Sequence, residues 1–196
     1  LYKTSFLIYS KSMKTKLLEQ EIKYEGWQLS PHWIYKNFKI QGDAAVAFIG
    51  ECEVKLTEMV DIEDVINNEP IYSKSMLSFI SEQFNIGLVE GVFRQRLLIC
   101  IIKEALEKRG VFVRRNGDDL FVNDKKLTVS IATKSVNSIL IHTGINIDSN
   151  GAPVKACGLE NDLGISDIEA FAAEILEKYS EEIDDIILAS TKVRGV

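Results

Sequence analysis

The stretch DDLFVNDKKLTVSIAT, residues 118–133, decides the fold. Apolar and β-branched residues on both sides of turn-forming residues predict a strand, a tight turn and a second strand. Two lysines, Lys125 and Lys126, directly follow the turn. Either both are solvated, or Lys126 points into a pocket over the sheet, where exclusion of water strengthens its attraction for a carboxylate or phosphate. The hairpin alone leaves both interpretations open.

The size and composition of the chain predict one folded domain, residues 1–196. Of its 196 residues, 46% are hydrophobic and 27% are charged, which is typical of a soluble globular protein. The net charge of −6 argues against a nucleic-acid partner, because such proteins need a basic face to displace counterions. This net charge still permits a local basic pocket.

The sequence also predicts where the protein is found. No apolar run approaches the roughly 20 residues that a membrane-spanning helix needs, so we expect no membrane association. The N-terminal segment has no small-residue cleavage site, and we expect no signal peptide. The 3 cysteines lack a CxxC spacing and there are only 2 histidines, which predicts a reducing cytoplasm and no metal centre.

The predicted elements follow the order strands, helices, strands, helices. Strands are expected at residues 5–10, 21–26 and 43–56, then helices at 61–69, 75–84 and 88–108, then strands at 111–115, 119–123, 126–133 and 137–147. The last two strands are expected to pair through a short turn. A capping box at Ser166 and Glu169 predicts a C-terminal helix, with a second helix after it. This order predicts an α+β fold with a mixed or antiparallel sheet packed against helices.

For three side chains, the residue type and its sequence neighbours allow two different roles. Cys157 lies beside Lys155 in a loop, which favours either a reactive thiolate with a lowered pKa or an ordinary packed thiol. His142, alone in an apolar strand, either binds a substrate or satisfies a backbone carbonyl. Arg115 either gathers with nearby arginines around an anionic ligand or pairs with the excess acidic residues. The sequence contains no Gly-rich phosphate loop and no serine nucleophile elbow, so the commonest ATPases and hydrolases are excluded.

Residues 94–166 resemble the catalytic domain of the biotin and lipoate protein ligase superfamily. Residues 119–120 match the turn of that family, and residues 144–146 match the end of the strand that follows the hairpin. Lys126 matches the hairpin lysine that contacts the acyl carboxylate and the α-phosphate in the family. The whole chain also resembles a small family of uncharacterised archaeal and bacterial proteins thought to share that fold.

The resemblance implies acyl transfer or ligation of a lipoyl, octanoyl or biotin-like group. It implies that Lys126 is catalytic and that Asp119, Gly144 and Asn146 bind the substrate. We expect Arg115 and His142 to bind the substrate as well. The expected partner is a small-molecule or carrier-bound acyl group; an acceptor protein and a homodimer stay open. The competing interpretation is a non-catalytic small-molecule-binding or sensing protein on the same scaffold.

The chain departs from the ligase pattern at several positions. Asp118 stands where the ligases usually have Asn, and Thr128 and Val129 replace a small residue and Gly. The best match to the Arg- and Gly-rich adenylate loop is residues 39–48, which contain one Gly and no Arg. These departures weaken an adenylation mechanism, so no cofactor is certain and ATP stays open.

A related branch of the superfamily, the octanoyl transferases, offers a mechanism without ATP. Its members use a cysteine in a Pro-Cys-Gly loop, and Cys157 with Gly158 lies in the corresponding loop here, although Ala156 replaces the Pro. The resemblance then implies that the Cys157 thiolate attacks an acyl thioester while Lys126 lowers the thiol pKa and handles a proton. It also implies that Lys125 faces outward.

Overall fold

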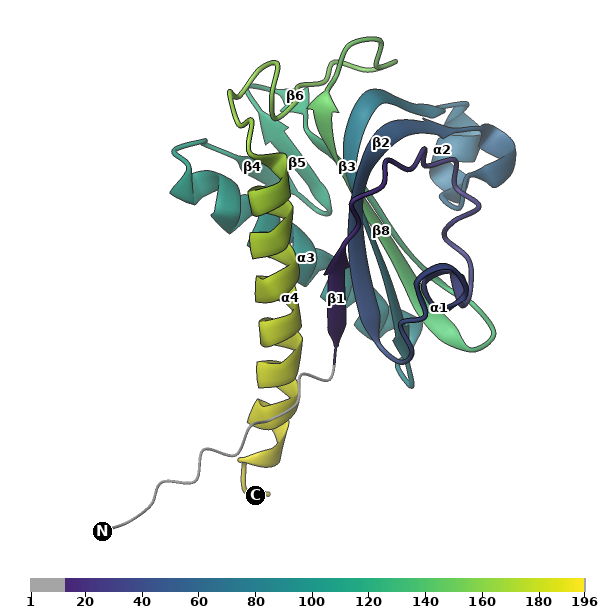
Figure 1. Ribbon diagram of the computed structural model, residues 1–196, viewed down its shortest axis with the longest axis vertical. Helices are drawn as coiled ribbons and strands as arrows, with labels where there is room; N and C mark the ends of the chain where they lie inside the picture. Colours follow the sequence, from purple (N-terminus) through teal and green to yellow (C-terminus); the bar gives the residue numbers. More distant parts are fainter. Residues whose placement is uncertain (1–12, 196) are drawn as a thin grey trace.

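The computed structural model describes residues 13–195, and its strands form two sheets (Figure 1). In the larger sheet the strand order is β1-β2-β3-β8-β7, and in the smaller it is β4-β5-β6. The elements, in chain order, are β1 (Lys14–Leu17), α1 (Trp33–Phe38), β2 (Ala44–Val54), the 3-10 turn η1 (Leu56–Glu58), α2 (Ile62–Asn67), β3 (Ile71–Phe84), α3 (Leu88–Lys108), β4 (Arg114–Asn116), β5 (Asp119–Val122), β6 (Lys125–Lys126), β7 (Thr128–Lys134), β8 (Ser138–Asp148) and α4 (Ile168–Thr191).

The larger sheet is mixed, as the order of elements predicted. Strand β1 runs parallel to β2, whereas the pairs β2 with β3, β3 with β8 and β7 with β8 are antiparallel. Helices α3 and α4 pack on one face of this sheet (Figure 1). The predicted α+β class, with a sheet packed against helices, is therefore confirmed.

The hairpin of residues 118–133 forms as expected, but in three pieces. Strand β5 pairs with β6 through a turn in which Asn123 and Asp124 both have left-handed backbone angles, φ 48° and 60°. This conformation matches the twist of a two-residue hairpin turn. Leu127 then separates β6 from β7, and β7 pairs with β8 as predicted.

The helix predicted over residues 75–84 is wrong, because this segment belongs to strand β3. Leu77 and Phe79 pack into the core under the helices, whereas Met76 and Ile80 pack into a second core on the opposite face. A central strand that is buried on both faces has apolar residues at odd and even positions. Their spacing then imitates the three- and four-residue steps of a helix.

Three other predicted elements need correction. Residues 21–26 form no strand; only Tyr24 makes an isolated bridge, with Cys52 of β2. The C-terminal segment is one continuous helix, since no Gly or Pro interrupts it between residues 168 and 191. Its N-cap is Asp167, which accepts a hydrogen bond from the Ala170 N–H, in place of the predicted cap at Ser166. The strand predicted at residues 5–10 lies outside the described residues.

The two long helices are joined by ion pairs at their surface. Glu174 of α4 accepts hydrogen bonds from Arg109 at 2.7 Å and from Lys108 at 3.4 Å.

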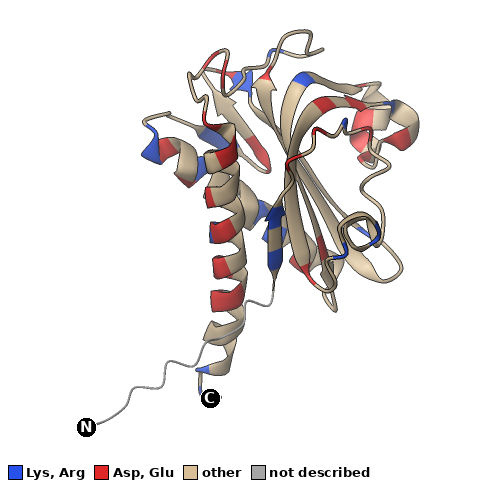
Figure 2. Cartoon of the chain, in the orientation of Figure 1, with Lys and Arg blue, Asp and Glu red and all other residues tan. Residues whose placement is uncertain are grey.

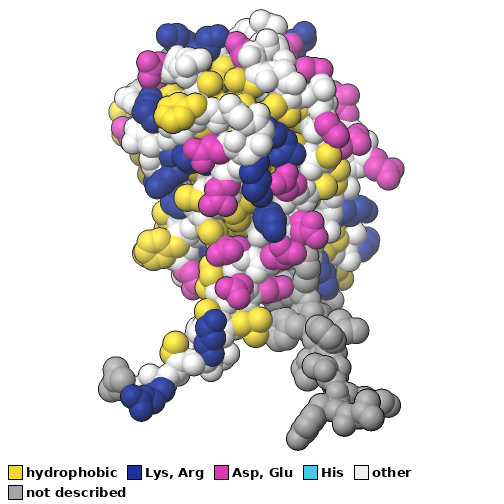
Figure 3. Space-filling view, turned by 90° about the vertical axis from the view of Figure 1, so that its left-hand side faces the viewer, with side chains coloured by type: hydrophobic (Ala, Val, Ile, Leu, Met, Phe, Trp, Pro, Cys, Tyr) yellow, Lys and Arg dark blue, Asp and Glu magenta, His cyan; other side chains and the backbone are white. Residues whose placement is uncertain are grey.

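One face of the molecule shows acidic, basic and hydrophobic side chains mixed together (Figure 3). Within residues 13–195, no helix has the length and apolar character needed to cross a bilayer.

Gly50 is expected to be essential for the packing of the segment that precedes α1 against β2. A Cβ at this position would lie 2.0 Å from the backbone oxygen of Ile22, which cannot move without breaking the Ile22 N–H bond to Ile49. We predict that Gly50→Ala lowers the free energy of unfolding by about 2 kcal/mol or more. Urea denaturation would measure this change. Gly195→Ala is the control, because nothing lies within 4 Å of a Cβ there, and an equal effect of both variants would contradict the prediction.

Candidate functional site

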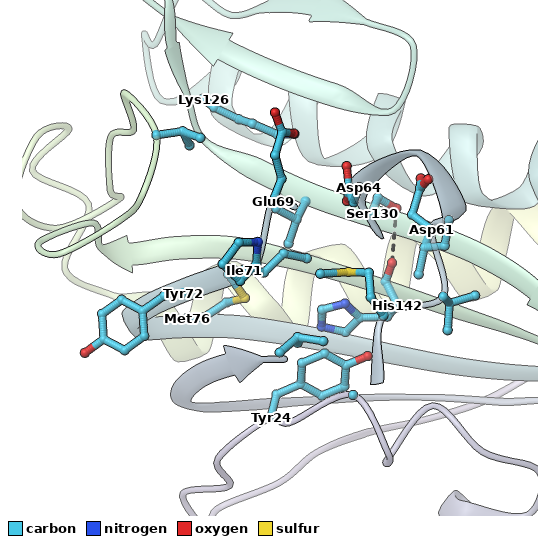
Figure 4. A pocket seen from close by; sticks show the side chains of 18 of the residues that line it. Tyr24, Asp61, Asp64, Glu69, Ile71, Tyr72, Met76, Lys126, Ser130 and His142 are labelled. Carbon is cyan, nitrogen blue, oxygen red and sulfur yellow. Dashed lines mark hydrogen bonds between the residues drawn. The ribbon is translucent and has the colours of Figure 1, made fainter. Parts of the chain in front are cut away.

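A cavity of about 300 Å³ lies on the sheet face opposite α3 and α4 (Figure 4). Its sheet side is formed by Met76 of β3, Val129 and Ile131 of β7, and His142 and Asn146 of β8. Residues 58–72, which include α2, and the hairpin lysine Lys126 close the other sides. This volume is at the lower end of the range for a small-molecule site.

The alternation of strand β8 positions the predicted residues of this strand. Side chains two residues apart point to the same face of a sheet, so His142, Gly144 and Asn146 share one face. His142 and Asn146 line the cavity directly. Gly144 contributes through Met76, because a Cβ at Gly144 would lie 2.2 Å from the Met76 sulfur. Only Gly allows Met76 to lie flat against this part of the sheet.

The hairpin directs its two lysines to different places. Lys126 lines the cavity, and its Nζ lies 3.0 Å from Oδ2 of Asp119. Burial raises the pKa of the Asp119 carboxyl, while the adjacent Lys126 lowers it in part. Lys125 lies outside the cavity lining and donates to Asp162 at 2.8 Å. Lys126 therefore faces the cavity and Lys125 faces away from it, as the resemblance implied.

His142 is a neutral residue in the cavity wall. Its ring stacks on Tyr24 at 3.8 Å, and Nε2 lies 3.3 Å from the Ser78 hydroxyl. Burial lowers the pKa of His142 to about 3, because nearby water is too scarce to stabilise an imidazolium. Figure 4 shows His142 and Tyr24 together, on the side of the pocket away from Lys126.

Cys157 differs from its expected state. The residue is 1% exposed, it is not among the cavity-lining residues, and its Sγ lies 3.7 Å from the carbonyl oxygen of Lys125. Burial, and then the negative charge of Asp162, raise the pKa of the thiol to about 11. The expected lowering of this pKa is therefore wrong. Cys157 meets Lys126 through the backbone, since its N–H donates to the Lys126 carbonyl at 3.0 Å.

Two other predicted elements of the site lie away from the cavity. Arg115 is exposed and donates to the Gly117 carbonyl at 2.6 Å, and it does not line the cavity. Residues 39–48, the best match to an adenylate loop, lead into strand β2 and contribute nothing to the lining. The structure thus brings together Lys126, Asp119, His142 and Asn146, with Gly144 behind them.

Sequence reasoning missed the acidic side of the cavity. Glu58, Asp61, Glu63, Asp64 and Glu69 all line it, and Figure 2 shows acidic residues on α2. Four of these acidic residues belong to the run DIEDVINNE at residues 61–69. The charge pattern of this run is typical of an ordinary solvated helix, so it did not indicate a site. Among the described residues, no group of His, Cys, Asp or Glu side chains is arranged to hold a metal ion.

Sequence reasoning also missed Asp118 as a fixed acidic group in the lining. Gln95 of α3 donates to Asp118 at 2.8 Å, and Arg96 lies 3.3 Å from the other carboxylate oxygen. Gln95 also donates to Ser130 at 3.0 Å, which in turn contacts Thr143 at 2.8 Å. This partly buried network joins α3 to strands β7 and β8 behind the cavity.

Comparison with known proteins finds relatives of unknown function and, at low sequence identity, solved structures with a similar fold. The family described as a domain of unknown function, DUF366, matches residues 13–194. Uncharacterized protein MJ0805 of Methanocaldococcus jannaschii is 41% identical over 180 residues, which are 89% of this chain and 81% of the relative. A solved protein of unknown function from Pyrococcus horikoshi is also 41% identical; the match covers 94% of this chain and 100% of that one, with a TM-score of 0.88.

Two more distant structures share the fold. Ta0514, a putative lipoate protein ligase from T. acidophilum, has a TM-score of 0.61 at 12% identity, with 88% of this chain and 86% of that chain covered. Biotin protein ligase from Aquifex aeolicus, in complex with biotin and ATP, has a TM-score of 0.55 at 14% identity, with 88% and 69% covered. The architecture is therefore that of biotin and lipoate protein ligase catalytic domains.

The neutral state of His142 is expected to make the protein sensitive to acid. The pKa of His142 is about 3 in the folded protein and 6.5 at its ordinary value, so between these pH values only the unfolded chain binds a proton at this residue. The stability that the neutral His142 contributes is therefore complete above pH 6.5 and is lost as the pH falls toward 3. We predict that the free energy of unfolding falls by up to about 1.4 kcal/mol per pH unit from this group. Urea denaturation from neutral pH downward should show a shallower slope for His142→Gln than for the parent. Equal slopes would contradict the prediction.

The thiol of Cys157 is expected to react slowly in the folded protein. Raising its pKa from 9.0 to about 11 lowers the thiolate fraction on the order of 100-fold, and burial slows access further. Peptide mapping after a timed exposure to iodoacetamide, in buffer and in urea, would give both rates. Alkylation of Cys157 at the same rate in buffer as in urea would show an accessible thiolate and restore the covalent mechanism.

Proposed function

The chain belongs to the family described as a domain of unknown function, DUF366, and for this member we propose acyl transfer at the Lys126 cavity. The acyl group is of the lipoyl, octanoyl or biotin-like kind, and the acceptor is a nucleophile that reaches the same cavity. The observation that carries this proposal is the position of Lys126, in a cavity of about 300 Å³ that it shares with Asp119 and Asn146.

Lys126 is suited to bind an acyl carbonyl. Its side chain is 32% exposed, so it is partly withdrawn from water, and its ammonium group has donors to spare after pairing with Asp119. Asn146 is 7% exposed, and its side-chain amide has no hydrogen-bond partner among the described residues. The backbone brings the two residues near each other, because the Asn146 N–H donates to the carbonyl of Leu127, the residue after Lys126. Together they form the donors that an acyl oxygen requires.

The transfer step follows from these groups. The acceptor attacks the carbonyl carbon of an acyl thioester, and the carbonyl electrons move to oxygen, where Lys126 and Asn146 stabilise the negative charge. The carbonyl then re-forms as the carbon–sulfur bond breaks. Asp119, whose pKa is raised by burial, accepts the proton of the acceptor and then gives it to the departing thiolate.

The charges of the cavity favour an activated acyl donor over ATP. The Aquifex aeolicus neighbour was solved with biotin and ATP, and Ta0514 was also solved with lipoic acid. Here the described lining contains seven carboxylates and no arginine, and its one lysine is paired with Asp119. A triphosphate placed among these carboxylates would be repelled. An acyl thioester carries its activation with it and needs no phosphate site.

Replacing Lys126 is expected to abolish the transfer. We predict that Lys126→Met lowers kcat/KM for an octanoyl thioester by about 100-fold or more, the usual loss when an oxyanion donor is removed. Lys125→Met, which removes the neighbouring charge outside the cavity, should keep the activity. Release of the free thiol would be followed in the presence of a panel of amine and carrier-domain acceptors.

Parallel reactions would separate the alternatives. Pyrophosphate release from ATP with octanoate, lipoate or biotin, lost in Lys126→Met, would replace thioester transfer with ligation. Octanoyl binding that depends on Lys126, without turnover from either donor, would mean a non-catalytic binding protein. Equal losses in Lys126→Met and Lys125→Met would contradict any specific role for Lys126.

A further inference from the structure

The acidic side of the cavity carries negative charge that no ion pair in the described chain neutralises. Glu58, Asp61, Glu63, Asp64 and Glu69 line it, and none of them forms an ion pair within residues 13–195. Asp61 accepts a hydrogen bond from the Glu63 N–H, which fixes the start of α2 and leaves its charge in place. These five residues are called the acidic wall below.

The cations near the cavity are already engaged elsewhere. Lys126 pairs with Asp119 at 3.0 Å, and Arg96 pairs with Asp118 at 3.3 Å. His142 is neutral at physiological pH, because burial lowers its pKa to about 3. The excess charge of the described lining is therefore strongly negative, and it lies on the acidic wall.

The carboxylates of the acidic wall affect one another. Burial raises the pKa of Asp64, and the charges of Asp61, Glu69 and Asp119 raise it further, while Lys126 lowers it. Crowded like charges destabilise the ionised state of each group, and a cation placed among them removes this cost. Figure 4 shows Lys126 on one side of the pocket, Asp61 and Asp64 on the other, and Glu69 between them.

Two buried polar groups independently indicate a polar ligand. Tyr24 is 4% exposed and lines the cavity, and its hydroxyl has no hydrogen-bond partner among the described residues. Asn146 is 7% exposed and also lines the cavity, and its side-chain amide likewise has no hydrogen-bond partner among the described residues. Both polar groups open onto the cavity, since the fully buried side-chain polar atom without a partner in the described chain is Nε of Arg96. A polar ligand in the cavity can therefore hydrogen-bond to them.

We propose that the ligand of this cavity is an amino-acyl compound, with its acyl end at Lys126 and a primary amine against the acidic wall. The acyl end rests on the proposed function; the amine end rests on the acidic wall. An ammonium group has three donors that can reach separate carboxylates, which suits a wall of dispersed acidic side chains that is not arranged to hold a metal ion. Because about 300 Å³ has room for one small molecule, both ends belong to the same molecule.

Calorimetric titration with three compounds of equal chain length tests the proposal. The probes are hexanoate, which has only the acyl end, hexylamine, which has only the amine, and 6-aminohexanoate, which has both. We expect 6-aminohexanoate to bind at least about fivefold more tightly than hexanoate at low salt, which corresponds to one partly solvated ion pair. The difference should shrink as salt is added, because salt screens exposed charges.

Paired variants assign the effect to the acidic wall. The double variant Asp64→Asn, Glu69→Gln should remove the advantage of 6-aminohexanoate and weaken hexylamine. The matched control Glu104→Gln, Glu177→Gln removes two exposed carboxylates of α3 and α4 outside the cavity and should leave both affinities unchanged. Lys126→Met should weaken hexanoate and leave hexylamine bound as well as before or more tightly, since a positive charge has been removed.

The outcomes separate this proposal from the proposed function. Hexanoate binding that depends on Lys126, with no advantage for 6-aminohexanoate, would overturn the amine and keep the acyl site. Hexylamine binding that survives Lys126→Met, without hexanoate binding, would keep the cationic subsite and overturn the acyl end. Simultaneous binding of hexylamine and hexanoate, with no gain for 6-aminohexanoate, would mean that the amine belongs to a separate molecule and would overturn the proposal. Absence of hexylamine binding would overturn it as well.

Discussion

Strand β8 is buried on both faces, and everything else at the site depends on that constraint. Its odd-numbered residues Ile145 and Ile147 pack into the core beneath α3 and α4, so they fix the strand in place. Its even-numbered residues His142 and Asn146 then have to face the opposite side, where the cavity lies. A register slip of one residue would bury the polar pair against the helices and would therefore be strongly disfavoured. The stability of the core and the position of the site are set by the same strand.

The hairpin residue Lys126 is held with similar firmness, but by its backbone. Its N–H donates to the carbonyl of Lys155, and its carbonyl accepts from the N–H of Cys157. The short strand β6 thus lies between β5 and the segment of residues 155–157. The resemblance implied that Lys126 acts on the Cys157 thiol, and the structure joins the two residues through these backbone hydrogen bonds. The buried thiol fills space beneath the hairpin, while the Lys126 side chain extends to Asp119.

Local patterns in the sequence predicted the parts of the molecule that are specified locally. The hairpin, the long helix α3 and the pairing of β7 with β8 follow from turn chemistry and apolar periodicity over short distances. Strand β3 was misread because burial on two faces removes the alternation that marks a strand. The acidic wall was missed because its residues precede Lys126 by more than fifty positions and resemble a solvated helix. Only the fold shows that Tyr24 lies against His142.

The two sides of the cavity are constrained differently by the fold. The sheet side cannot change freely, since each substitution on β8 or β3 also affects a core. The acidic wall sits on a short helix and its flanking turns, where five of the lining residues are charged and mostly solvated. Substitutions there change the charge of the cavity without disturbing the packing of the sheet. The sheet side therefore fixes the shape of the cavity, and the acidic wall sets its charge.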